Sequence, residues 1–190
     1  MQTLAPIRAA SHRRPIVLDL GLAVSVGLLA ALAKRYLDFH LGIPGHAGVG
    51  WIAVLISGRL VNPRRGMAAV AGVSMGLWSV PVGLGHSLGY NLVLYGLVAA
   101  LLDGPGIRRL PLGRVLGAAT AGVAVHVAKF VFVLVNVWLS GIVRTVELYG
   151  LSNALVNHVV FGAAGGLVGW GLWRTTGAAV ARIRRLTGGV

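Results

Sequence analysis

The most unusual chemical group in this sequence is a lysine near the middle of a long apolar run. Lys129 lies in the stretch 126–136, which reads HVAKFVFVLVN. A charged side chain at the centre of a membrane-spanning helix costs roughly 2.5–3.5 kcal/mol. His126 lies three residues before Lys129 and Asn136 seven residues after it, so the three polar groups share one face of a helix. We therefore expect that face to point into the protein interior or into a cavity.

Catalytic chemistry finds little support in the remaining residues. The sequence contains no H-E-x-x-H, G-x-S-x-G or Walker A pattern. Its acidic residues all fall at the edges of apolar runs, and they are Asp19, Asp38, Asp103 and Glu147. We expect Asp19 to be a boundary charge and Asp103 a turn residue. Since no buried carboxylate is expected as a general base, we expect neither an enzyme nor a cofactor.

The composition is that of a polytopic membrane protein. The chain has 190 residues, of which 56% are hydrophobic and only 11% are charged. A soluble domain of this length could not bury so much apolar surface. The chain has no cysteine, which excludes disulfides, thiolate metal sites and cysteine nucleophiles. The length allows a single membrane domain over residues 1–190.

Apolar runs and the turns between them predict an all-α, compact bundle of six transmembrane helices. No Lys, Arg, Asp or Glu occurs from 66 to 102. As one helix that stretch would be about 55 Å long, against a hydrocarbon core of about 30 Å. It must therefore turn once, and residues 81–85, PVGLG, are suited to the turn. The expected helices are 15–33, 47–61, 66–80, 86–102, 113–140 and 151–173, followed by a basic tail at 174–190.

Basic residues set the expected orientation of the bundle. The formal net charge of +13 would suggest nucleic acid in a soluble protein, but here the 17 Lys and Arg separate apolar runs. Thirteen of them fall in the N-terminal segment, 59–65, 108–114 and the tail, against three in the loops of the other side. Because cytoplasmic loops carry the excess of Lys and Arg, we expect both termini in the cytoplasm and no nucleic-acid partner.

Small residues suggest where helices approach one another. In the first apolar run, Ala23, Gly27 and Ala31 form a small-residue stripe suited to close contact with another helix. The same run ends in Ala-Leu-Ala at 31–33, which imitates a signal-peptide cleavage site. We expect a retained helix, although the charge distribution leaves cleavage open. The spacings Gly72/Gly76, Gly113/Gly117 and Gly162/Gly166 also favour tight packing.

This topology gathers polar side chains at the outer end of the bundle and predicts an outward-facing pocket for a polar small molecule. The candidate substrate-binding residues are Lys129, Asn136, His46, His86, Tyr90, Asn91, Asn153, Asn157 and His158. Trp51 and Trp138 could stack on the ligand. Any single Asn or His could instead bond a neighbouring helix. The lysine favours a carboxylate, a phosphate or another electron-rich ligand, while a metal site formed by His46, His86 and His158 is the alternative.

The sequence resembles the substrate-binding S component of energy-coupling factor (ECF) transporters. The likeness rests on six helices in about 190 residues, the polar 34–46 loop, GRLVNPRRGMAAVAGVSMGL leading into the third helix, and YGLVAALLDG closing the fourth. It departs from the metal-type S components, which are known for an N-terminal Met-His segment, because this chain begins Met1-Gln2. That difference lowers cobalt or nickel as a substrate.

The resemblance implies a protein of the prokaryotic cytoplasmic (inner) membrane that captures a vitamin or similar small molecule from outside. It implies a pocket formed by the first loop and helices four to six. The implied partners are a transmembrane coupling subunit, docked on Ala23, Gly27 and Ala31, and two ATPase subunits. Two other functional classes stay open, which are a membrane enzyme or its accessory subunit, and an assembly protein without transport activity.

Overall fold

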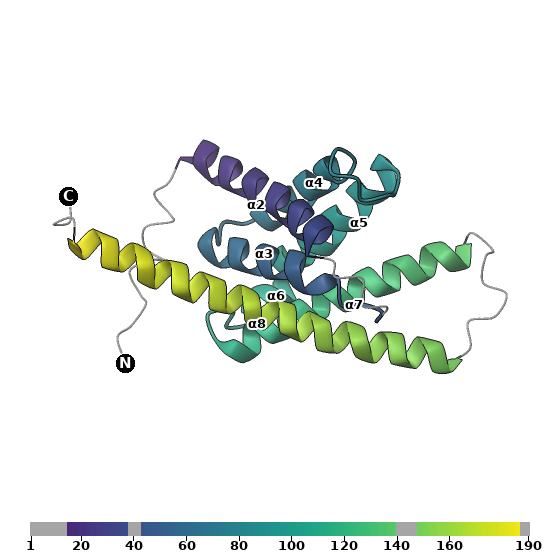
Figure 1. The fold of residues 1–190 in the computed structure, drawn as a ribbon. Coiled ribbons are helices and arrows are strands. Elements are labelled where there is room, and N and C mark those ends of the chain that lie inside the picture. Colours follow the sequence, from purple (N-terminus) through teal and green to yellow (C-terminus); the bar gives the residue numbers. More distant parts are fainter. Residues whose placement is uncertain (1–14, 38–42, 140–147, 187–190) are drawn as a thin grey trace.

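The computed structural model describes residues 15–37, 43–139 and 148–186. The described part is helical and contains no strand, which confirms the all-α prediction. Its elements are α2 (Ile16–Tyr36), α3 (Gly48–Val61), α4 (Met67–Ser79), α5 (Leu88–Ala100), the short 3-10 helix η1 (Leu101–Asp103), α6 (Pro105–Arg109), α7 (Val115–Leu139) and α8 (Leu148–Leu186) (Figure 1).

Four segments of the described chain are long and apolar enough to cross a membrane. They are Ile16–Tyr36, Leu88–Arg109, Val115–Leu139 and Gly150–Ala179. The helices α3 and α4 are apolar but shorter, with 14 and 13 residues. At 1.5 Å per residue each covers about 20 Å of a hydrocarbon core about 30 Å thick. The chain is therefore a membrane-embedded helical protein with four long apolar helices, and a count of six crossings stays a prediction.

The helix boundaries follow the sequence expectations closely except at the ends of α2 and α8. The turn after α4 falls at 81–85 as expected, and Gly83 and Gly85 adopt positive φ angles of 76° and 78° there. The last helix was expected to end at 173, but α8 continues to Leu186 through the segment expected as a basic tail. That segment contains no proline and is rich in alanine and arginine, which are strong helix formers. In Figure 1 the yellow end of α8 extends beyond the other helices.

Glycine brings the backbones of α7 and α8 into direct contact. A Cβ atom added at Gly122 of α7 would lie 2.2 Å from the carbonyl oxygen of Gly162 of α8. One added at Gly166 would lie 2.2 Å from the carbonyl oxygen of Ala118. Gly72 of α4 meets the α5 backbone in the same way, so these predicted contacts are confirmed. Gly117 instead lies against the backbone of Pro111, outside any helix pair.

The small-residue stripe of α2 packs on α4. Ala23 and Ala31 are buried. A Cβ atom at Gly27 would lie 2.3 Å from the carbonyl oxygen of Ala71 of α4. The prediction of a close helix contact is therefore confirmed, but the neighbour belongs to the same chain. The assignment of Ala23, Gly27 and Ala31 to a coupling subunit stays a prediction, and within this chain α4 covers the face.

Ion pairs join the helices at one end of the bundle, which we call the arginine end. It comprises the start of α2, the end of α3, the start of α4 and the segment η1. Arg59 Nε lies 3.5 Å from Asp103 Oδ1, and both side chains are at most 10% exposed. The other carboxylate oxygen, Oδ2, accepts hydrogen bonds from the backbone N–H groups of Ala68 and Ala69 at 3.0 and 3.1 Å. Asp103 is therefore more than a turn residue, since it caps α4.

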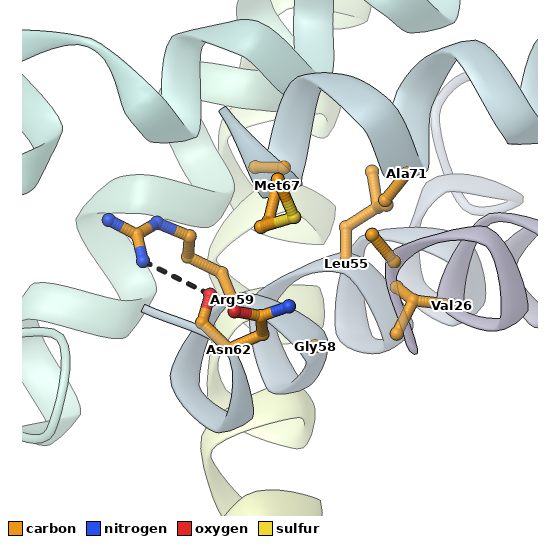
Figure 2. A pocket seen from close by; sticks show the side chains of 9 residues that line it. Val26, Leu55, Gly58, Arg59, Asn62, Met67 and Ala71 are labelled. Atoms are coloured by element: carbon orange, nitrogen blue, oxygen red, sulfur yellow. Dashed lines mark hydrogen bonds between the residues drawn. The ribbon is translucent and has the colours of Figure 1, made fainter. Parts of the chain in front are cut away.

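A second ion pair ties α2 into the same network. Asp19, expected as a boundary charge, is 1% exposed and accepts a hydrogen bond of 2.9 Å from Arg64. The side-chain amide of Asn62 donates to the backbone oxygen of Asp19 at 3.0 Å. Figure 2 shows Arg59 donating to the backbone oxygen of Asn62, beside a cavity of about 10 Å³. That volume holds roughly one water molecule, so the arginine end has no room for a larger ligand there.

The glycine contacts predict opposite effects for two substitutions on one helix. Gly166→Ala should lower the free energy of unfolding by about 1–3 kcal/mol, because its methyl group would overlap the α7 backbone. The matched control is Gly171→Ala, where a Cβ atom meets nothing within 4 Å. This change should raise stability by about 0.5–1 kcal/mol. Detergent unfolding followed by circular dichroism measures both, and equal effects would contradict this packing.

The ion pair at the arginine end predicts a larger loss. Asp103→Ala should lower the free energy of unfolding by about 3–5 kcal/mol, because it removes a carboxylate beside the buried Arg59 charge and uncaps α4. Arg65→Ala, at an exposed position of the same end, should change it by less than about 0.5 kcal/mol. The same unfolding assay compares the two variants. A similar stability for both would show that the pair contributes little.

Candidate functional site

An open pocket of about 370 Å³ lies at the end of the bundle opposite to the arginine end. Four segments form its walls, which are the last turn of α2, the turn between α4 and α5, the first half of α5 and the second half of α7. The polar side chains that line it are Lys34, Arg35, His86, Tyr90, Tyr95 and Lys129. We call this cavity the lysine pocket.

Both lysines of the chain line this one pocket. The sequence has 15 arginines but only two lysines, Lys34 and Lys129. Lys34 and Arg35 lie in the last turn of α2, whereas Lys129 enters from α7. Three cationic side chains from two helices therefore surround one cavity. Such a cluster attracts anions and electron-rich groups.

Lys129 takes the position that its spacing predicts. Its side chain is half-buried and lines the lysine pocket. The ammonium Nζ lies 5.8 Å from the centre of the Trp51 ring, within cation–π range. Trp51 itself is 0% exposed, so it cannot stack on a ligand as the sequence suggested. Trp138 is 70% exposed and does not line the pocket.

His86 and Tyr90 form one wall of the pocket, as their i, i+4 spacing predicts. Their ring centres are 4.9 Å apart, and the Tyr90 ring packs edge-on against Phe132 at 5.5 Å. Ser87 caps α5 by accepting a hydrogen bond of 3.3 Å from the Tyr90 backbone N–H. The cap and the ring contacts fix both rings. They offer a ligand an apolar surface together with a hydroxyl and a ring nitrogen.

Three other predicted residues satisfy the backbone near them and do not line the pocket. Asn91 is fully buried, and its amide donates to the His86 backbone oxygen at 3.2 Å, which holds the turn before α5. Asn136 donates to the Phe132 backbone oxygen at 2.9 Å within α7. His46 bonds the backbone oxygen of Ile43 through Nδ1. None of the three is among the residues that line the lysine pocket, and their predicted place at a ligand stays a prediction.

The predicted residues of α8 also lie away from the pocket. His158 packs against the rings of His126 and Phe130, with centres 4.5 and 4.7 Å away, and its Nδ1 donates to the backbone oxygen of Ala154 at 2.7 Å. Asn153 is exposed and Asn157 is half-buried. None of the three is among the described residues that line the lysine pocket. The start of α8 lies at the same end of the bundle as the pocket, but these three side chains do not line it.

The histidines proposed as alternative metal ligands occupy three different environments. His46 lies edge-on to Phe161 at 6.4 Å, His86 lies on Tyr90, and His158 lies on His126. Within the described ranges, no three His, Cys, Asp or Glu side chains come together in a way that could hold a metal ion. The geometry therefore favours the lysine pocket over a histidine site.

Sequence reasoning did not assign Lys34, Arg35 and Tyr95 to the site. The first helix was expected to end at 33, which placed both basic residues in a loop, but α2 continues to Tyr36. The extra turn places both residues on the pocket wall, with Arg35 beside Gly83, where a Cβ atom would lie 3.9 Å from Arg35 Nε. The scarcity of lysine is the signal that could have identified Lys34, since its only counterpart is Lys129.

The fold and the pocket define the class of protein broadly, as a membrane-embedded helical protein with an open cationic pocket at one end. Comparisons with protein-family models, curated proteins and solved structures find no match to this chain. The function is therefore inferred from the chemistry of the pocket.

The lysine pocket predicts which amines a water-soluble acylating reagent reaches. In lipid nanodiscs, sulfo-N-hydroxysuccinimidyl acetate should modify both Lys34 and Lys129, because both line an open cavity. Peptide mass spectrometry reads the two sites separately. Modification of Lys34 without Lys129 would show that Lys129 faces lipid or a closed core, and would contradict the pocket geometry.

Proposed function

We propose that the lysine pocket captures a small anionic or electron-rich polar molecule. The observation that carries this proposal is the convergence of Lys34, Arg35 and Lys129 on one open cavity. A carboxylate 4 Å from one such cation gains about 4 kcal/mol at an effective dielectric constant of 20. The guanidinium of Arg35 adds a planar fork that fits carboxylate or phosphate oxygens.

The remaining lining suits an organic molecule better than a bare ion. The pocket volume of about 370 Å³ lies within the range of about 300–1,000 Å³ that is typical of small-molecule sites. The rings of His86 and Tyr90 and the side chains of Leu84, Leu94 and Val133 supply apolar contact area. The Tyr90 hydroxyl and the His86 ring supply hydrogen bonds. The proposed ligand thus has an anionic end and an apolar or aromatic body.

The proposed role of this binding is uptake, with the chain as the substrate-binding S component of an ECF-type importer. Six arginines belong to the arginine end or to the segment that follows it, opposite to the pocket, and they are Arg59, Arg64, Arg65, Arg108, Arg109 and Arg114. By the positive-inside rule this supports a cytoplasmic arginine end and a pocket that opens outward. The proposed cycle is capture from outside and reorientation of the bundle.

The proposed importer needs partner subunits for its energy. A transmembrane coupling subunit and two ATPase subunits would supply it, consistent with the absence of a Walker A pattern from this sequence. The coupling subunit would contact a lipid-facing surface other than the α2 stripe. Candidate surface includes the exposed apolar residues of α2, namely Ile16, Val17, Leu20 and Val24. Co-purification of a coupling subunit and two ATPases would support transport over an enzyme accessory or assembly role.

The binding proposal is tested by replacing the charge of Lys129. Gently purified wild-type protein should retain a small molecule that native mass spectrometry detects as an added mass. Lys129→Met should remove that mass, because the ligand loses its central cationic contact, while the protein stays folded and inserted. The matched control is Arg65→Met at the exposed arginine end. It should keep the bound molecule. Equal retention in both variants would sink the role of Lys129.

A further inference from the structure

A buried tryptophan lies directly behind the cationic centre of the pocket. Trp51 of α3 is 0% exposed and does not line the cavity. Its ring nevertheless faces the ammonium of Lys129, with Nζ 5.8 Å from the ring centre. An ammonium group within about 6 Å of an indole centre is attracted by the ring quadrupole. The packing of α3 against α7 forms this contact without a bound ligand.

Two further rings hold the indole in this orientation. Tyr95 contacts Trp51 edge-on at 5.8 Å with an interplanar angle of 71°. His126 does the same at 6.2 Å and 77°. Edge-to-face contacts of this kind are the favoured geometry for aromatic pairs. The indole N–H has no hydrogen-bond partner among the described residues, so ring packing rather than hydrogen bonding sets its orientation.

The imidazole of His126 is itself fixed on both sides. Its Nδ1 donates to the backbone oxygen of His158 at 3.1 Å. On the other side a Cβ atom at Gly48 would lie 2.3 Å from the ring, so only glycine leaves room for the imidazole there. Gly48 and His158 thus hold the His126 ring. That ring contacts the Trp51 indole, and the indole contacts the Lys129 ammonium. This chain of contacts connects α3, α7 and α8 to one ammonium group.

We propose that Trp51 is the positioning residue of the lysine pocket, holding the Lys129 ammonium at the cavity wall without neutralising its charge. Its effect on ligand affinity rests on the proposed function, whereas the positioning itself does not. Because the indole face is not an anion, the contact with Trp51 does not itself neutralise the ammonium. Loss of the indole should weaken anion binding about 2–30-fold, and it should do so through Lys129 rather than through Lys34.

The two-lysine composition allows a direct test of this proposal. Reductive methylation with ¹³C-formaldehyde keeps the positive charge and labels only Lys34, Lys129 and the N-terminal amine. The Lys34→Arg and Lys129→Arg variants assign the three N-methyl NMR signals. The Lys129 signal should be shifted upfield of the Lys34 signal by the Trp51 ring current. It should also show nuclear Overhauser contacts to indole protons.

Substitutions of Trp51 separate a positioning role from general packing. Trp51→Leu should move the Lys129 signal to the position of the Lys34 signal and leave Lys34 unchanged. Trp51→Phe keeps an aromatic face and should keep part of the upfield shift. If Trp51→Leu does not fold, the wild-type Overhauser contacts decide alone. Absence of both the upfield shift and those contacts in the wild type would overturn the proposal.

Addition of benzoate distinguishes this inference from the proposed function. Benzoate serves as a carboxylate probe with an apolar body. If both proposals hold, it shifts the Lys34 and Lys129 signals of the wild type with saturation, and Trp51→Leu needs about 2–30-fold more of it. An upfield Lys129 signal that benzoate never moves would keep the positioning role and reject anion binding. Saturable benzoate shifts with the same affinity in the wild type and in Trp51→Leu would keep anion binding and reject the effect of Trp51 on it.

Discussion

Direct backbone contact between helices is the constraint on which the rest of this structure depends. Apolar side chains gain little by leaving lipid for a helix interface, so packing between membrane helices relies on small residues and close approach. Gly165 and Gly169 of α8 lie against α3, and a Cβ atom at Gly169 would be 2.5 Å from the Ala53 carbonyl oxygen. Gly122 of α7 and Gly162 of α8 bring α7 against α8 as well. These contacts place α3 and α7 side by side, and with them Trp51 and Lys129.

The charged side chains at the two ends of the bundle lie in different environments. At the arginine end, Arg59 and Asp103 are buried and paired, because a buried charge without a partner would be strongly destabilising. At the other end, Lys34, Arg35 and Lys129 line a cavity that is open to solvent. Solvent access lowers the cost of placing three cations there, because water can solvate them. The arginine end thus holds its charges inside the packed helices, whereas the opposite end places its cations beside an open cavity.

The features predicted correctly from sequence are those that depend on local spacing. The helical face of Lys129 predicts an interior or cavity position, and the i, i+4 spacing of His86 and Tyr90 predicts that the two side chains face the same way; all three line the lysine pocket. The turn at 81–85 followed from glycine and proline and from the length of an uncharged run. Each of these inferences uses only the geometry of one helix or the thickness of one bilayer.

The features that sequence reasoning missed depend on how helices rotate against one another. His158 shares an end with the pocket but turns toward His126, and Trp51 is buried although tryptophan favours membrane interfaces. The small-residue stripe at Ala23 and Gly27 correctly predicts a close helix neighbour, but it does not identify that neighbour as α4. Periodicity identifies a face, and only tertiary packing determines what that face meets.

The central claim is that the lysine pocket is a binding site for a small anion. The most direct measurement is a crystal structure of the protein purified gently from its own membrane. The account predicts density for a small molecule between Lys34, Arg35 and Lys129, with an oxygen-bearing group within hydrogen-bond distance of the Lys129 ammonium. A cavity filled by a lipid chain, or closed by the protein's own side chains, would contradict it.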